Sequence, residues 1–390
     1  MTAKPEVVPN DYRETEAGPV PKDWELKPLG TFVALQRGHD LTARDRRQGD
    51  VPVMGSAGQN GFHNTALVRG PGVVLGRSGA SFGQAHYCIS DFWPHNTALY
   101  VTDFFGNFPL FVFYYLKSID FRRHNSGGAQ QSLNRNFIAP IMVAVPKRVE
   151  QETIAEALAD ADALVESLEQ LLAKKRDIKQ GAMQELLTGT RRLPGFEREP
   201  GFKDSEIGII PKDWELDYIE NVANITTGGR NTQDSIDDGQ YPFFVRSQTV
   251  ERINSYSFDG EAVLTAGDGV GTGKVFHYIN GKFDAHQRVY RISRFASHVN
   301  GYFFFLYFST HFYARIMQMT AKSSVDSVRR EMIARMLLPI PPTQTEQSAI
   351  AAIVSDMEDE IAAIETKLAK ASQIKQGMMH ELLTGRIRLV

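Results

Sequence analysis

The chain of 390 residues contains a single cysteine, Cys88. One thiol cannot form a disulfide within the chain, and it excludes a zinc site built from several thiolates. The histidines are scattered without a His-Glu-x-x-His spacing, so the sequence offers no ligand set for a catalytic metal. We therefore expect neither a metal nor a cofactor.

Long apolar runs are also missing. No uninterrupted apolar stretch reaches about 18 residues, the length that would cross a bilayer. The first residues, MTAKPEVVPN, have neither the basic flank nor the apolar middle of a secretion signal. We expect a cytoplasmic protein without a membrane partner.

What the chain has instead is internal repetition, which fixes the architecture before any local detail. The stretch GPVPKDWEL ends at Leu26, and GIIPKDWEL ends at Leu216. Two longer blocks start at Gln151 and Gln347, each after a proline-containing lead that closes on Glu-Gln. They end in IKQGAMQELLTG and IKQGMMHELLTG, so the shared motifs come in two sets.

The two long blocks have the pattern of helices that pack in a coiled coil. Apolar residues recur at steps of 4 and 3, and Gly189 and Gly385 stand where a helix would stop. At about 1.5 Å per residue each helix would be on the order of 55 Å long. Antiparallel packing is favoured, because parallel packing would need a long return of the chain after Gly189. A helical hairpin inside one domain is the alternative. The seam residues are Ile154, Leu158, Ala161, Val165, Leu168 and Leu172, and Ile350, Val354, Met357, Ile361, Ile364 and Leu368.

Charge is distributed unevenly under a net value of −3. Residues 27–150 hold 13 Lys and Arg against 7 Asp and Glu, whereas both long blocks are acidic. Residues 217–346 balance at 13 and 13, with local groups of arginine. Basic patches of this kind are typical of phosphate binding, and a solvated surface with ordinary ion pairs is the alternative.

The variable stretches between the shared motifs have the pattern of compact mixed domains. Runs such as GVVLGR, NTALYVT, EAVLTAG and QRVYRIS indicate strands, and FPLFVFYYLKS and GYFFFLYFSTHFYARIM indicate aromatic helices. We expect these aromatics in the core rather than on a base-stacking platform.

Glycine-rich loops follow a strand in both variable stretches, at 76–84 (GRSGASFGQ) and 266–274 (AGDGVGTGK). Glycine allows the backbone to approach a phosphate or a base edge closely, and Arg77, Ser78, Gln84 and Lys274 supply donors. The glycines before Lys274 are wrongly spaced for a nucleotide-binding P-loop. A purely structural turn is the remaining alternative.

A second pair of loops lies at 126–138 (SGGAQQSLNRNFI) and 321–333 (AKSSVDSVRREMI). Ser132 and Ser327 are predicted N-caps of helices whose first turns contain Arg135 and Arg330. Such helices would direct unpaired N–H groups at an anion. The loop sequences differ while the serine stays, which indicates one frame reading two targets; a plain capped helix is the alternative.

Together these features predict an α+β fold with a pseudo-two-fold internal repeat: two globular α/β domains separated by two long antiparallel helices that form a coiled coil. The expected boundaries are a flexible N-terminus at 1–10, a first domain at 11–150, a helix at 151–188, a linker at 189–210, a second domain at 211–346, a helix at 347–385 and a tail at 386–390.

This organisation resembles the specificity subunit of type I restriction-modification systems, on the paired PKDWEL motifs, the Glu-Gln leads and the duplicated IKQG…ELLTG endings. The resemblance implies that each variable domain is a target recognition domain for one half of a bipartite sequence in double-stranded DNA. It implies that the helices space the domains and dock two modification (methyltransferase) subunits, and that restriction subunits join where the system has them. Methylation and cleavage would belong to these partners. The sequence agrees, since it lacks the Asn-Pro-Pro-aromatic motif of adenine methyltransferases and a nuclease carboxylate pair.

The residues expected at these sites fall into two sets. Those predicted to contact DNA are Arg77, Ser78, Gln84, Arg122, Arg123, Gln130, Gln131, Asn134, Arg135, Arg246, Gln248, Lys274, Arg288, Lys322, Ser323, Arg329 and Arg330. Those predicted to dock partners are Lys179, Gln180, Lys375 and Gln376. The competing hypothesis is a scaffold that bridges proteins through two repeated ligand-binding domains without DNA.

Overall fold

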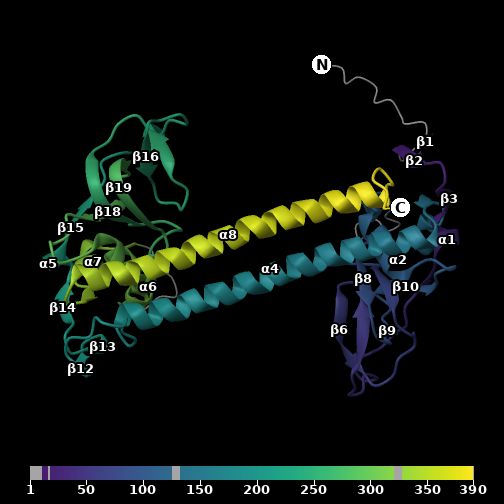
Figure 1. Ribbon diagram of the computed structural model, residues 1–390, viewed down its shortest axis with the longest axis horizontal. Helices are drawn as coiled ribbons and strands as arrows, with labels where there is room; N and C mark the ends of the chain where they lie inside the picture. The colour runs from purple at the N-terminus through teal and green to yellow at the C-terminus, as the bar shows by residue number, and fades with distance from the viewer. Residues whose placement is uncertain (1–10, 16–17, 125–131, 320–326, 390) are drawn as a thin grey trace. The chain divides into compact units, whose positions relative to one another are not determined.

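The computed structural model describes residues 11–15, 18–124, 132–319 and 327–389. The chain forms two compact units: unit 1 combines residues up to Gln170 with those from Glu365, and unit 2 is Leu171–Ile364. Two long helices, α4 (Arg148–Thr188) and α8 (Gln344–Leu383), each contribute one segment to each unit (Figure 1). The predicted N-terminal segment 1–10 lies outside the described residues.

Unit 1 is built on short, mainly antiparallel sheets. The four-stranded sheet has the order β4-β10-β7-β8, a three-stranded sheet has the order β6-β5-β9, β3 pairs with β11, and β1 and β2 form a hairpin. The run GVVLG of β7 is buried along its whole length, as expected for a central strand. The strands are β1 (Tyr12–Thr15), β2 (Gly18–Pro21), β3 (Glu25–Pro28), β4 (Ala34–Arg37), β5 (Val51–Gly55), β6 (Gly58–His63), β7 (Gly72–Gly76), β8 (Ala85–Cys88), β9 (Trp93–Pro94), β10 (Ala98–Asp103) and β11 (Met142–Val145), and the shorter helices are α1 (Leu29–Phe32), α2 (Pro109–Ser118), the 3-10 turn η1 (Phe121–His124) and α3 (Arg135–Ile138).

Unit 2 repeats this plan with one larger sheet. Its six strands have the order β15-β20-β18-β19-β16-β17, in which β16 and β19 are parallel. The pair β14–β21 and the hairpin β12–β13 match β3–β11 and β1–β2 of unit 1. The elements are β12 (Phe202–Ser205), β13 (Gly208–Pro211), β14 (Glu215–Tyr218), α5 (Ile219–Val222), β15 (Asn224–Thr227), η2 (Thr232–Asp234), β16 (Tyr241–Phe244), β17 (Glu251–Ile253), β18 (Phe258–Ala266), β19 (Phe276–Ala285), β20 (Val289–Ser293), α6 (Gly301–Met319), α7 (Arg330–Ala334) and β21 (Leu337–Ile340).

The aromatic helices are core elements, as predicted. In unit 2, Phe303, Phe304, Phe308 and Phe312 of α6 are fully buried, and the rings of Phe308 and Phe312 stack with centroids 4.5 Å apart. The helix α2 supplies the corresponding side chains in unit 1. Each core also takes in residues from both long helices, namely Ile154, Leu158, Leu382 and Leu383 in unit 1, and Leu186, Leu187, Ile350 and Val354 in unit 2.

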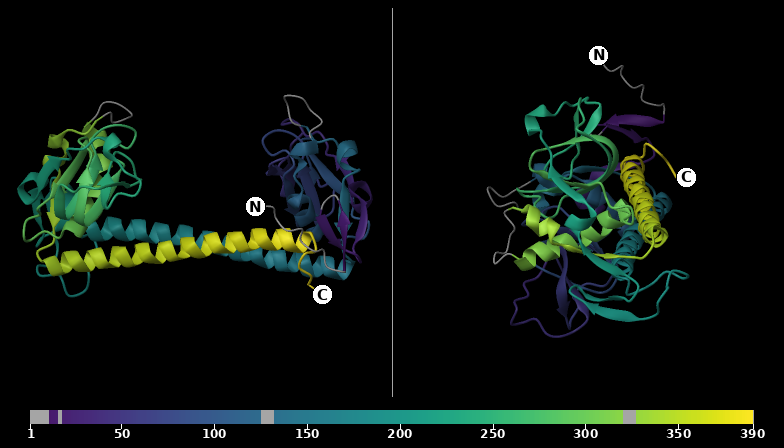
Figure 2. Two further views of the ribbon diagram at one scale, coloured as in Figure 1. Left: turned by 90° about the horizontal axis from the view of Figure 1, so that it is seen from above. Right: turned by 90° about the vertical axis from the view of Figure 1, so that its left-hand side faces the viewer.

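Segments of α4 and α8 lie side by side and antiparallel within each unit, as predicted (Figures 1 and 2). In unit 1 Lys375 pairs with Asp162. In unit 2 Lys175 pairs with Glu360 and Lys179 pairs with Glu358, so the register runs in opposite directions along the two helices. All twelve predicted seam residues are buried or half-buried.

Both long helices begin three residues before the predicted start, because the turn after Pro146 and after Pro342 is already helical. The segment expected to be a linker contains β12 and the start of β13. The segment expected to be a tail is packed, with Leu389 against the core of unit 1. In the described part of the chain, no helix is both long and apolar enough to cross a bilayer.

Candidate nucleic-acid interface

The two loops singled out in unit 1 meet in space. Ser78 of the glycine-rich loop forms an antiparallel bridge with Ser132, and Leu133 N donates to Arg77 O at 2.8 Å. A pocket of about 690 Å³ opens beside this contact and is lined by Arg77, Asn134 and Arg135, all predicted DNA contacts. The sequence therefore identified residues that the fold brings together.

The same pocket contains residues that the sequence analysis missed. Gln36, Arg37 and His39 line it from the end of β4 and the turn that follows. Gly38 makes that turn possible, since a Cβ there would lie 2.1 Å from His95 O. The sequence feature that could have identified them is the run Gln-Arg-Gly-His, which spans the end of β4 and the turn after it. This run lies outside the glycine-rich loops.

Other predicted residues of unit 1 lie around a different pocket, of about 440 Å³. Gln84 and Arg122 line it together with Lys117 and Asp120. Both Arg122 and Arg123 are exposed, and Arg122 Nε donates to Asp120 at 2.7 Å, so the charge of Arg122 is already balanced. Gln130 and Gln131 lie outside the described residues, between η1 and Ser132.

Unit 2 brings its two loops together in the same way. Asp268 bridges to Ser327, and Val328 N donates to Gly267 O at 2.7 Å. Two predicted residues converge there on one carboxylate: Arg246 Nη1 lies 3.0 Å and Arg288 Nη1 lies 2.7 Å from Asp268. Lys274 stands over the ring of Tyr313, 5.1 Å from its centroid.

The remaining predicted residues of unit 2 are at its surface. Gln248, Arg329 and Arg330 are exposed, and Arg330 has Glu331 3.7 Å away. Lys322 and Ser323 lie outside the described residues.

The predicted serine caps are wrong. In unit 1 the cap of α3 is Asn134, whose side chain accepts from Asn136 N at 3.0 Å. In unit 2 the residue before α7 is Arg329, and no side chain among the described residues caps that helix. Ser132 and Ser327 instead form isolated β-bridges with the glycine-rich loops, three residues before each helix begins.

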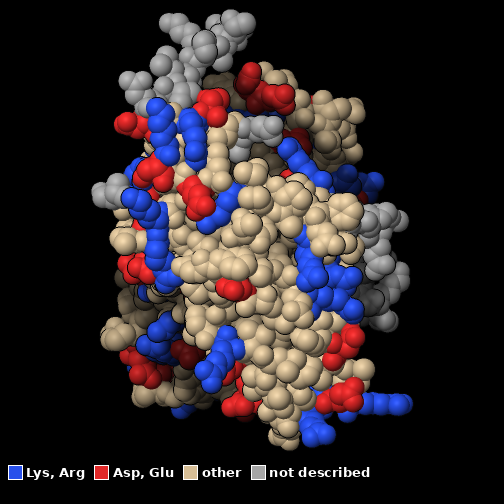
Figure 3. Space-filling model, turned by 90° about the vertical axis from the view of Figure 1, so that its right-hand side faces the viewer, with Lys and Arg blue, Asp and Glu red and all other residues tan. Residues whose placement is uncertain are grey.

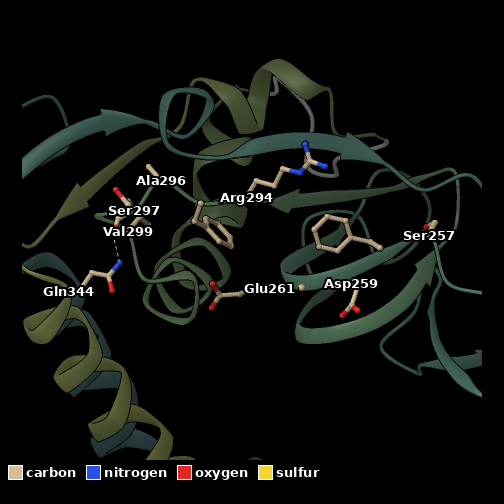
Figure 4. A pocket seen from close by; sticks show the side chains of 11 residues that line it. Ser257, Asp259, Glu261, Arg294, Ala296, Ser297, Val299 and Gln344 are labelled. Carbon is tan, nitrogen blue, oxygen red and sulfur yellow. Dashed lines mark hydrogen bonds between the residues drawn. The ribbon is translucent and has the colours of Figure 1, made fainter.

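Charge alone does not outline the interface. In the view of Figure 3, Lys and Arg side chains lie in separate groups with acidic side chains between them. A pocket of about 630 Å³ at the start of β18 in unit 2 contains Arg294, but Asp259 and Glu261 also line it (Figure 4). Two carboxylates beside one arginine disfavour phosphate there. Among the described residues no group of His, Cys, Asp and Glu could hold a metal ion.

The repeated motifs form an ionic junction in each unit. In unit 2, Arg192 lies 2.6 Å from Asp213 of the second PKDWEL and 2.8 Å from Glu346 at the start of α8. In unit 1, Arg388 makes the same contacts with Asp23 and Glu150. Each guanidinium also stands over a tryptophan, Trp214 or Trp24. The motifs recur because each junction needs one copy of each.

Two further repeated residues complete these junctions. Gln151 Oε1 accepts from Phe108 N, and Gln347 Oε1 accepts from Asn300 N, so each Glu-Gln lead caps the aromatic helix of its unit. Gly189 and Gly385 have φ near +73° and fit against Pro211 and Pro21. A Cβ at either glycine would lie within 2.6 Å of the proline ring.

The predicted docking residues differ in availability. Lys179 and Lys375 bind Glu358 and Asp162 of the other helix, and these carboxylates also accept from Tyr302 and Tyr114. Gln180 and Gln376 are exposed at equivalent positions of the two helices. The docking hypothesis thus depends on the glutamines and the surface around them.

The architecture is that of an internally duplicated recognition protein, with one pair of divergent loops on each unit and one shared helical frame. The chain belongs to the type I restriction modification DNA specificity family, whose domain model matches residues 21–174 and 211–373.

Individual relatives agree with this assignment. The chain is 29% identical over 180 residues to the EcoDI specificity subunit of Escherichia coli, which covers 45% of this chain but only 38% of that protein. It is 24% identical over 305 residues to the MjaVIII specificity subunit of Methanocaldococcus jannaschii, covering 72% and 70% of the two chains. The crystal structure of an S subunit from M. genitalium superposes with a TM-score of 0.67 at 12% identity, over 92% of this chain and 96% of that one.

Proposed function

We propose that this chain is the non-catalytic DNA-recognition subunit of a type I restriction-modification complex. Each unit would read one half of a bipartite duplex sequence through its paired loops. The observation that carries the proposal is the meeting of the glycine-rich loop with the loop before α3 or α7 in both units, with arginines beside each contact. The sequences of these loops differ between the two units.

The duplicated helices support the second part of the proposal, the docking of two identical modification subunits. Gln180 and Gln376 occupy equivalent, exposed positions, so one partner surface could recognise both. Restriction subunits would join through the same complex. Because the repeated motifs hold each unit together internally, variation in the loops could change the DNA target without altering the docking frame.

The test is binding of the purified full chain to a pool of duplexes with a randomised segment. We expect enrichment of a two-part sequence and an affinity that falls steeply with salt, because cations that contact phosphates release counterions. The scaffold hypothesis predicts no sequence enrichment and no salt-sensitive duplex binding, and either result would reject DNA recognition by this chain.

A further inference from the structure

Three strand ends of unit 2 meet in a small ionic cluster, Arg246–Asp268–Arg288. Arg246 follows β16, Asp268 follows β18, and Arg288 precedes β20. The carboxylate divides its two oxygens between the arginines, with Arg246 on Oδ1 at 3.0 Å and Arg288 on Oδ2 at 2.7 Å. Each guanidinium is thereby fixed in direction by one of its N–H groups.

The cluster leaves most of its donors available. The Asp268 side chain is 19% exposed, whereas those of Arg246 and Arg288 are 44% and 62% exposed. Within the described residues, the other N–H groups of these guanidiniums have no hydrogen-bond partner. The flanking Gly269 has φ of +86° and places no side chain beside Arg246. Burial would raise the pKa of Asp268, but the hydrogen bonds from Arg246 and Arg288 lower it, so the carboxylate is charged.

The charges are not needed to hold the loops. Unit 1 makes the same loop contact through Leu133 N and Arg77 O. At the positions that correspond to the cluster it has Ser56, Ser78 and Thr97, of which Ser56 N donates to Thr97 Oγ1 at 3.3 Å. The correspondence rests on matched backbone hydrogen bonds, such as His95 N to Met54 O and His286 N to Phe244 O. Surface ion pairs also add little stability, about 0 to 1 kcal/mol.

The charge of Asp268 determines whether the two arginines are better suited to bind a phosphate or a base edge. Next to a phosphate, Asp268 would repel the ligand and offset part of the attraction. A guanine edge in the major groove is neutral and offers two acceptors, O6 and N7, which match the arginine fork. A side chain held in place before binding also loses less conformational entropy on binding.

We propose that Arg246 and Arg288 read guanine in the half-site of unit 2, and that Asp268 is the residue that positions them. This inference rests on the proposed DNA-recognition function and adds to it the base, the reading residues and the positioning residue. It also assigns different chemistry to the two half-sites, because unit 1 has hydroxyl groups in the same place.

The test starts from the enriched duplex of the wild-type chain and from single-base variants of it. We expect guanine in the half-site that depends on unit 2, with a preference over adenine of roughly 5- to 150-fold per contact. Arg288→Gln and Arg246→Gln should each abolish the preference at one position and leave the other half-site unchanged. Arg288→Lys keeps the charge without the planar fork, so it should reduce the preference less than Arg288→Gln does, with an unchanged salt dependence.

Asp268→Asn separates positioning from a structural role. Without the carboxylate the arginines can turn to phosphates, so the preference for guanine should fall and the affinity for unrelated duplexes should rise. The salt dependence of binding should become steeper, by about 0.9 in its logarithmic slope for each new phosphate contact. If Asp268 had a purely structural role, the variant should lose both the preference for guanine and the affinity for unrelated duplexes. Lys282→Gln is the matched charge control, since Lys282 of β19 lies opposite Asp259 in the β18–β19 ladder, at the other end of β18 from Asp268, and should not alter base preference.

The outcomes distinguish the two levels of the proposal. If the wild-type chain selects a two-part sequence but the arginine variants weaken all duplexes equally, the guanine assignment is overturned and DNA recognition stands. If the half-site that depends on unit 2 contains no guanine, the guanine assignment is likewise overturned and DNA recognition stands. If the wild-type chain selects no sequence, DNA recognition fails and the guanine assignment fails with it.

Discussion

The two units differ at their loops and agree at their junctions. Where three strand ends meet, unit 1 carries only hydroxyl side chains, and unit 2 carries two arginines around Asp268. At the junctions, by contrast, Arg388 and Arg192 make equivalent contacts with one Asp, one Glu and one Trp. The contacts that hold each junction together are thus kept in both units, whereas the side chains at the three strand ends are not.

The junctions are alike in contacts but not in burial. In unit 2 the side chains of Asp213 and Glu346 are 5% and 1% exposed. In unit 1 the side chain of Glu150 is 4% exposed, but that of Asp23 is 53% exposed. Because an uncompensated charge costs more when it is buried, this difference gives the largest expected effects.

Removing the junction arginine should destabilise unit 2 more than unit 1. Arg192→Ala leaves two buried carboxylates without their partner, and we expect a loss of about 3 to 5 kcal/mol in the free energy of unfolding. Arg388→Ala should cost about 2 to 3 kcal/mol, because Asp23 can be hydrated and Glu150 keeps the hydrogen bond from Trp24. Urea unfolding followed by tryptophan fluorescence measures both.

The neighbouring arginines provide matched controls for this experiment. Arg191 and Arg386 stand near the junction residues with side chains 72% and 47% exposed. Replacing either with alanine should change stability by no more than about 0.5 kcal/mol. Equal losses for Arg192→Ala and Arg388→Ala would contradict the role assigned to burial.

Loop arginines should affect DNA binding by smaller amounts, and unequally. Arg135 Nη1 donates to the neutral acceptor Leu35 O, whereas Arg330 has the carboxylate of Glu331 beside it. Arg135→Ala should therefore weaken binding more than Arg330→Ala, with the salt slope reduced by about 0.9 if one phosphate contact is lost. Fluorescence anisotropy at several salt concentrations tests this. Unchanged affinity of both variants at low salt would remove these residues from the interface.

Much of the fold was predictable because the repeats and the heptad pattern are direct consequences of packing. The seam from Ile154 to Leu172, the aromatic helices and the antiparallel arrangement all follow from apolar spacing and chain connection. The serine caps were predicted wrongly, since a local sequence preference cannot reveal that Ser132 pairs with Ser78, 54 positions away in the sequence. That bridge depends on tertiary packing.

The candidate site was predicted in part for the same reason. Glycine and arginine in the loops marked Arg77, Arg246 and Arg288, but which residues share a pocket depends on how strands pair. The sequence therefore does not single out Arg37 and His39, and it predicts the docking lysines at helix positions outside the seam. Their carboxylate partners lie on the other helix, 179 or 213 positions away in sequence.

The smallest expected effect concerns the lysines that join the two helices. Lys375→Met and Lys179→Met keep the aliphatic stem and remove one ion pair, so each should lower the free energy of unfolding by about 1 to 2 kcal/mol. Lys370→Met and Lys174→Met are the matched controls, since both lysines are exposed on the same helices.

The unit 1 pair should also show a defined pH dependence. Burial would raise the pKa of Asp162, but the hydrogen bonds from Lys375 and Tyr114 lower it below the ordinary value of 3.8. A carboxyl group whose pKa is lower in the folded state stabilises that state at any pH above its pKa in the unfolded chain. This stability is lost as the pH falls through the pKa of the folded state. The difference between wild type and Lys375→Met should accordingly be full at neutral pH and shrink below about pH 3.8. A difference that stays constant on acidification would show that Lys375 acts through packing and not through its charge.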